Sequence, residues 1–281
     1  MMWEQKLIQT DRGEFEIFEA GNGEPLCVTH LYSEFNERGY HFADRFVEDF
    51  KVYLVNLKET GNSTEVIHED ELSMSETSKD LEAIRMALGY DHWNFAGHST
   101  GGMLGLHYAA DHPDSLKRLI VGGASATNEY MEHQDSIYCD KNPDNDRLKE
   151  IVSVLKSEDV SKEELVQAGR EWAEMSLYDP ERYEDYFSKP SSGKVAQKRL
   201  DYYSNTELST YDIRENISEI TTPTIIFCGK YDSQCPFVFS EEIFHLVPNS
   251  SFYIFENSDH LPHIEEKEKF SEMVKDFNCL V

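Results

Sequence analysis

Three residues of this 281-residue chain have the chemistry of a nucleophile and its proton relay: Ser99, Asp232 and His260. A serine hydroxyl is a weak nucleophile, so it needs a base within hydrogen-bond reach, and a third group must orient that base. His260 is the candidate base, and Asp232 is a candidate for the orienting acid. Together they predict acyl transfer from a carbonyl substrate to water.

The serine lies in a stretch of small residues, Gly97-His98-Ser99-Thr100-Gly101-Gly102. The apolar run 93–96 before it predicts a short strand, and residues 103–110 predict a helix. A strand that turns abruptly into a helix crowds its neighbours and strains the turn residue, so glycine is expected on both sides of Ser99. The turn would hold the hydroxyl at the sheet edge, near the free N–H groups of the helix N-terminus.

This Gly-x-Ser-x-Gly pattern resembles the nucleophile elbow of the α/β-hydrolase superfamily, in a form close to the common G-H-S-x-G-G. The resemblance implies an α/β fold, with a doubly wound, mostly parallel sheet and an inserted helical cap. His30-Leu31-Tyr32 stands where the family usually has His-Gly-x. By that match the backbone N–H groups of Tyr32 and Thr100 form the oxyanion hole. Leu31 replaces the usual glycine, which puts the loop geometry in doubt but leaves a backbone donor in place.

Asp232 and Asp259 are both candidates for the orienting acid. Each could instead simply form a turn. The family places its acid in Gly-x-x-Asp after the penultimate strand, and Gly229-Lys230-Tyr231-Asp232 matches that position. His260 resembles the family histidine, which follows Ser-Gly, although Asp259 replaces the glycine here. The resemblance therefore favours Ser99, Asp232 and His260 as the catalytic set.

A metal site made by Asp259, His263, Glu265 and Glu266 is the competing interpretation of the same region. The spacing does not match the helical H-E-x-x-H pattern, and no cysteine partner is nearby, so we expect no metal there. His263 is expected at a helix start. The predicted chemistry requires no cofactor.

The remaining elements follow the alternation of strand and helix that is typical of a parallel sheet. An N-terminal hairpin is expected over residues 6–19. The further strands are expected at 25–29, 51–56, 92–96, 116–122, 223–228 and 251–255, with helices after Ser73, Ser99 and Pro236 and at the C-terminus. The alternation stops between residues 127 and 210, where helical patterns rich in acidic residues and tyrosine predict the cap. We therefore predict a core made of 1–126 and 211–281.

Composition limits the partners of this chain, which has 54 acidic and 26 basic residues and a formal net charge of −28. Such a surface repels nucleic acid and anionic membranes. The five cysteines form no dense framework, and no apolar run is long enough to span a membrane, so a reducing cytoplasm is the expected setting. The expected partner is a small molecule or a short peptide.

The cap would determine the substrate, and His30, Glu171, Trp172 and Glu174 are the predicted contacts. A small carboxylic ester or amide is the main expectation. Prolyl aminopeptidases resemble this pattern too and bind the substrate amine with acidic cap residues, although the chain lacks their H-G-G-P-G stretch. Some proteins of this fold instead act as ligand-binding regulatory modules with slow turnover, and that class also stays open.

Overall fold

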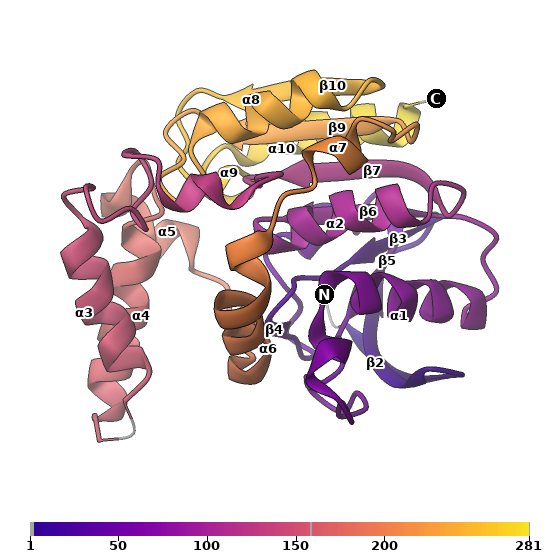
Figure 1. Cartoon of the computed structure of the whole chain (residues 1–281), viewed down its shortest axis with the longest axis horizontal. Helices are drawn as coiled ribbons and strands as arrows, with labels where there is room; N and C mark the ends of the chain where they lie inside the picture. The colour runs from indigo at the N-terminus through magenta and orange to yellow at the C-terminus, as the bar shows by residue number, and fades with distance from the viewer. Residues whose placement is uncertain (1–2, 158, 281) are drawn as a thin grey trace.

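An eight-stranded sheet forms the centre of the computed structural model, which describes residues 3–157 and 159–280 (Figure 1). Across the sheet the strands are β1 (Glu4–Thr10), β2 (Gly13–Ala20), β5 (Phe50–Val55), β3 (Glu24–Val28), β6 (Trp93–His98), β7 (Leu116–Gly122), β9 (Thr224–Gly229) and β10 (Ser250–Phe255). β1 and β2 form the antiparallel hairpin, and β2 also runs antiparallel to β5. All pairs from β5 to β10 are parallel. The predicted fold class is confirmed.

The helices of the core follow the strands of the parallel part of the sheet. They are α1 (Met74–Ala87), α2 (Thr100–Asp111), α7 (Arg214–Ile217), α8 (Phe237–Leu246), α9 (Pro262–Glu265) and α10 (Lys267–Cys279), with the 3-10 helices η1 (Ala43–Arg45) and η2 (Glu69–Leu72). The side chain of Ser73 caps α1 by accepting a hydrogen bond from the backbone N–H of Glu76, as the sequence predicted. Such a cap stabilises a helix by about 1 kcal/mol.

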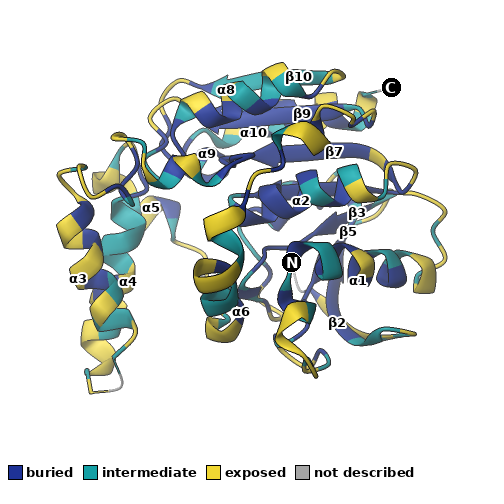
Figure 2. Ribbon diagram, viewed as in Figure 1, coloured by how far each residue is buried: buried dark blue, intermediate teal, exposed yellow. Residues whose placement is uncertain are grey.

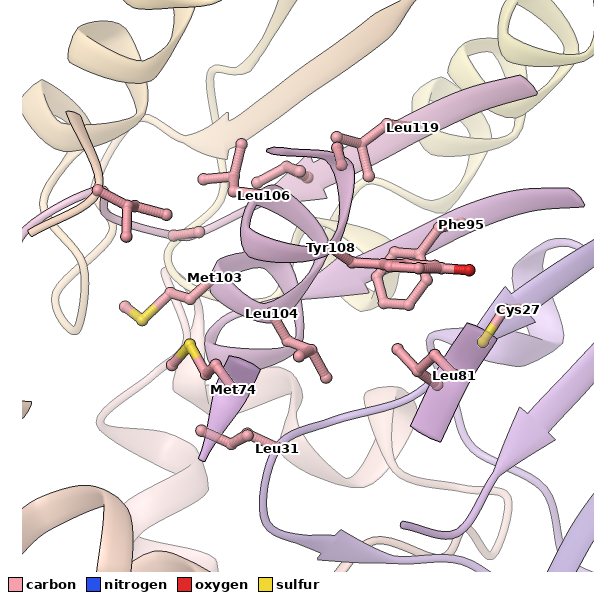
Figure 3. Packing of buried hydrophobic residues seen from close by; sticks show 14 of the residues in the cluster. Cys27, Leu31, Met74, Leu81, Phe95, Met103, Leu104, Leu106, Tyr108 and Leu119 are labelled. Carbon is pink, nitrogen blue, oxygen red and sulfur yellow. The ribbon is translucent and has the colours of Figure 1, made fainter. Parts of the chain in front are cut away.

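Side chains that alternate along each strand fill two separate cores, one on each face of the sheet. In β6, Phe95 belongs to the core beneath α1, α2 and α8, whereas Ala96 belongs to the core beneath α10. Figure 3 shows α2 in the first core, where Tyr108 lies beside Phe95 with 5.9 Å between ring centroids. This packing fixes the strand ends from which the functional loops emerge.

The segment between β7 and β9 is mostly helical and extends away from the sheet (Figure 1). It contains η3 (Asn128–Met131), α3 (Asn145–Leu155), α4 (Lys162–Glu174), η4 (Pro180–Arg182), α5 (Tyr183–Tyr186), β8 (Lys194–Val195), α6 (Gln197–Tyr202), the π-helical turn η5 (Tyr203–Glu207) and η6 (Leu208–Thr210). No pattern in the sequence indicated β8, which pairs antiparallel with β4 (Ser33–Glu34). A two-residue strand is too short to have a pattern of its own.

This segment is less buried than the sheet. The central strands are buried, whereas α3 and α4 expose much of their surface (Figure 2). All five cysteines are free, and Cys27 and Cys228 are buried inside β3 and β9 as expected. None of the helices in the described ranges combines the length and apolar character needed to cross a membrane.

Candidate active site

Ser99 occupies the turn between β6 and α2, and its backbone is strained. Its φ of 56° and ψ of −130° lie outside the regions that L-residues favour. A Cβ at position 97 would lie 2.1 Å from the carbonyl oxygen of Gly101, and one at position 101 would lie 2.5 Å from that of Thr29. The predicted reason for the two glycines, crowding at an abrupt turn, therefore holds in this structure.

Asp232 and His260 meet side chain to side chain, although 28 residues separate them. Asp232 lies in the loop after β9, and His260 lies in the loop after β10. The two carboxylate oxygens are 2.9 and 3.0 Å from His260 Nδ1. Backbone N–H groups of Gln234 and Cys235 also donate to Oδ1, at 3.0 and 2.8 Å. The carboxylate is thus fixed, and Nδ1–H donation to it leaves Nε2 as the basic nitrogen.

The competing carboxylate, Asp259, has other partners. Its Oδ1 accepts hydrogen bonds from the backbone N–H and the hydroxyl of Ser233, at 2.7 and 2.9 Å. Burial and the nearby charge of Asp232 raise the pKa of Asp259 to about 7. Burial would lower the pKa of His260, but the charge and hydrogen bond of Asp232 outweigh it, so the pKa of His260 is raised above 6.5. Asp232 is therefore the carboxylate that acts on the imidazole.

His98 has a contact that the sequence did not predict. We expected a packing residue, and the ring is indeed buried, with its centroid 4.5 Å from that of His260. In addition, Nε2–H donates to the backbone carbonyl of His260 at 2.7 Å. Burial lowers the pKa of His98 well below 6.5, so the ring stays neutral. His98 thereby ties the β10 loop to the residue that precedes Ser99, and its position in the motif was the only available signal.

The loop after β3 carries the predicted oxyanion-hole residue Tyr32, and His30 organises this loop. His30 Nδ1 is 2.9 Å from the hydroxyl of Ser33, and it is 3.5 Å from the Tyr32 N–H, at the limit of hydrogen bonding. His30 Nε2 is 3.1 Å from the Thr100 hydroxyl. Thr100 is the first residue of α2, whose leading N–H groups have no partner within the helix. Both predicted donors therefore belong to residues that the same imidazole contacts.

A cavity of about 650 Å³ lies between this edge of the sheet and the helical segment. Ser99 and His260 line it, and so do His30, Tyr32 and Trp172. Most of its wall is apolar and comes from the helical segment, including Tyr130, Leu148, Val152, Ala173, Tyr203 and Leu208. The structure thus brings the predicted nucleophile and base to one hollow, large enough for a drug-sized ligand.

Two of the predicted substrate contacts do not lie in the wall of this cavity. The carboxylate of Glu171 pairs with Arg147, and that of Glu174 pairs with Arg170 at 2.7 Å. The reason is the periodicity of α4, which turns Trp172 and Ala173 toward the cavity and these two glutamates away from it. Sequence alone did not tell which face of the helix would dock.

Two carboxylates that the competing interpretation assigned to a metal already accept hydrogen bonds from the protein. Glu265 accepts hydrogen bonds from the backbone N–H groups of Asp259 and Tyr178, at 2.8 and 2.7 Å. Glu266 accepts from the N–H of Asn257 and the hydroxyl of Ser258. In the part of the chain that the structure describes, no group of three or more His, Cys, Asp or Glu residues is arranged to hold a metal ion.

Comparison with known proteins agrees with the fold. The family model described as "alpha/beta hydrolase fold" matches residues 21–267, and the chain belongs to that family. A solved structure of an alpha/beta fold family hydrolase from Bacillus anthracis is 48% identical, with a TM-score of 0.96, and the match covers 99% of this chain and 100% of that one. This protein is therefore a hydrolase.

Two of the more distant matches have names that indicate different activities. A proline iminopeptidase from Heyndrickxia coagulans is 26% identical over 277 residues, which is 95% of this chain and 94% of that protein. An esterase from Exiguobacterium antarcticum is 21% identical with a TM-score of 0.73, over 98% of this chain and 100% of that one. At that identity the esterase shows a shared fold alone.

Proposed function

We propose that this hydrolase cleaves carboxylic esters or amides through an acyl-enzyme on Ser99. The observation that carries the proposal is the contact of His260 with Asp232 at the cavity that Ser99 also lines from its strained turn. Ser99 attacks the substrate carbonyl, and His260 Nε2 takes the hydroxyl proton and returns it to the leaving group. Asp232 holds the imidazole in the tautomer that leaves Nε2 free.

The tetrahedral intermediate carries a negative oxygen, and the N–H groups of Tyr32 and Thr100 are the proposed donors to it. Each such donor lowers the barrier by about 3 kcal/mol. Water then attacks the acyl-enzyme, with His260 again as the base. The helical segment 127–210, which supplies most of the cavity wall, is in this proposal the lid that selects the substrate.

The cavity favours an ester with an apolar acyl or alcohol group over a substrate with a free amine. No aspartate or glutamate of the described chain lines the cavity, whereas Lys149 and Lys156 do. An ammonium group would therefore lose its hydration without meeting a carboxylate, and this loss is unfavourable. The apolar wall, in contrast, stabilises hydrocarbon in proportion to the area that it buries.

A prolyl-type aminopeptidase is the second candidate, and one observation favours it. The relative from Heyndrickxia coagulans, named a proline iminopeptidase, matches almost the whole length of this chain. For this activity a carboxylate must reach the substrate amine after movement of the lid, because Glu171 and Glu174 are paired with arginines outside the cavity.

Steady-state turnover distinguishes these candidates. Purified protein is assayed with 4-nitrophenyl esters of two to eight carbons and with proline and other amino-acid 4-nitroanilides, and Ser99→Ala is the control. We expect turnover of esters that Ser99→Ala abolishes, with little release from proline anilide. Faster cleavage of proline anilide than of any ester would favour the aminopeptidase. A single burst without turnover would favour a ligand-binding regulatory module.

A further inference from the structure

A second cavity, of about 400 Å³, adjoins the active-site cavity. Tyr40, Phe187 and Leu261 line both cavities and form the partition between them. Three side chains that carry nitrogen, those of His41, Lys189 and His263, also line the second cavity, whose wall is otherwise largely apolar. The mechanism described above uses none of these three side chains.

Positive charge gathers around this second cavity. Burial, together with the charges of Arg45, Lys267 and Lys189, lowers the pKa of His41 to about 4. Burial likewise lowers the pKa of Lys267, and Arg45 and Lys189 add to that effect. The three cations therefore act on the same small region.

These cations lack close counter-charges, although acidic residues outnumber basic ones 54 to 26. Within the described ranges, no carboxylate oxygen lies within 4.0 Å, the limit for an ion pair, of a charged nitrogen of Arg45, Lys189 or Lys267. Burial lowers the pKa of Arg45, and Asp44 and Glu268 oppose this effect only from beyond that distance. In so acidic a chain, unpaired cations around one hollow indicate that a negative group from outside completes the site.

Two buried nitrogen atoms in this region support the same conclusion. His263 is 2% exposed and lines the cavity, and its Nδ1 has no hydrogen-bond partner within the described chain. Arg45 Nε is also buried without a partner within the described chain, and the charge of Arg45 acts on both His41 and His263. Native proteins leave few buried polar atoms unpaired, because each costs about 1–3 kcal/mol. A ligand in the cavity would meet the His263 ring, and a hydrogen-bond acceptor would pair with Nδ1 in the tautomer that carries its proton there.

We propose that this second cavity binds a small oxyanion, such as a carboxylate or phosphate group. Lys189, His41 and His263 are the side chains in its wall, and Arg45 and Lys267 supply charge from behind it. The anion is either a free ion or, since Tyr40, Phe187 and Leu261 line both cavities, one end of a substrate. The second source rests on the function proposed above, and the first does not.

Imidazole NMR signals of His41 and His263 report on binding while inorganic phosphate or acetate is added at constant ionic strength. We expect saturable shifts and a higher pKa for His41, since an anion offsets the cations around it. Lys189 is exposed, so Lys189→Gln should fold normally and weaken binding at least about fivefold. Lys275→Gln removes another exposed charge, from α10, and should bind like the native protein. The proposal would be overturned if no saturable shifts appeared up to about 50 mM anion, a concentration beyond ordinary weak binding. Equal affinity of Lys189→Gln and the native protein would also overturn it.

A second assay identifies the source of the anion. It compares 4-nitrophenyl monoesters of dicarboxylic acids with neutral esters of the same carbon number. A preference for the charged ester that Lys189→Gln removes, and Lys275→Gln retains, would assign the site to the substrate. Phosphate binding without such a preference would assign it to a free ion. If no ester is hydrolysed, the proposed function fails, and the NMR titration still tests the anion site.

Discussion

Replacement of Arg199 by methionine is expected to destabilise the fold and to slow the reaction together. Arg199 belongs to α6 in the helical segment and is 2% exposed. Its guanidinium donates to buried acceptors on three separate parts of the core. These acceptors are the carbonyl of Leu31, the carbonyl of Lys58 at 3.2 Å, the carbonyl of Leu72 at 3.3 Å and the hydroxyl of Thr77 at 2.9 Å. The Leu31 carbonyl immediately precedes Tyr32, so this contact holds the loop of the proposed oxyanion hole.

Two opposing contributions determine the size of the effect. Each hydrogen bond from a charged donor contributes about 1.5–3 kcal/mol, and a methionine side chain at this position would leave all four acceptors unpaired. In the other direction, burial lowers the pKa of Arg199 to about 10 from 12.5. At 1.36 kcal/mol per pKa unit, removal of the buried charge recovers about 3 kcal/mol. The net expectation is a loss of at least about 3 kcal/mol in the free energy of unfolding.

Urea unfolding and ester hydrolysis measure the two consequences. Arg199→Met should lower the urea midpoint, and kcat should fall more than KM rises, because the oxyanion donor acts in the transition state. Arg199→Lys should recover only part of the lost stability and part of the lost kcat, since one ammonium cannot reach all of these acceptors. Lys198→Met removes the neighbouring exposed cation, whose ion pair with Glu59 contributes at most about 1 kcal/mol. If Arg199→Met were as stable as Lys198→Met, the reasoning would be wrong.

Three further substitutions test the site. Asp232→Asn should lower kcat about 10³–10⁴-fold. It should also move the acid limb of the pH–rate profile to lower pH, because the charge and hydrogen bond of Asp232 raise the pKa of His260 in the native protein. An unchanged limb would contradict the assigned pair. Asp259 has a raised pKa, so its stabilisation is present below about pH 4 and is lost as pH rises through about 7. Asp259→Asn should therefore flatten the fall in melting temperature over this range, and an unaltered slope would refute the pKa assignment. Gly97→Ala would place a Cβ 2.1 Å from the Gly101 carbonyl and should cost about 1–3 kcal/mol; an unchanged melting temperature would exclude that crowding.

Local patterns in the sequence were enough to predict the fold and the places of Ser99, Asp232 and His260. Strand and helix periodicities are properties of neighbouring residues, and a parallel sheet brings the carboxyl ends of its strands to one edge. The loops after β6, β9 and β10 therefore had to lie near one another. The choice of Asp232 over Asp259 required the family position as well, because both are acidic residues in turns.

Contacts between distant residues could not be predicted in this way. His98 and the carbonyl of His260 are 162 positions apart, and Arg199 and that of Leu31 are 168 apart. Neither contact has a periodic pattern to reveal it. The face that α4 turns to the cavity is a related case. The way the helix docks places Trp172 in the cavity wall and leaves Glu171 and Glu174 out of it.

Covalent labelling of the native protein with a fluorophosphonate probe tests the central claim most directly. The probe reacts with a serine only where a base activates it, so the labelled residue identifies the nucleophile. We predict one adduct per chain, mapped by peptide mass spectrometry to Ser99, with no labelling of Ser99→Ala and much slower labelling of Asp232→Asn. Labelling of Ser99→Ala at the native rate, or an adduct on another residue, would contradict the account.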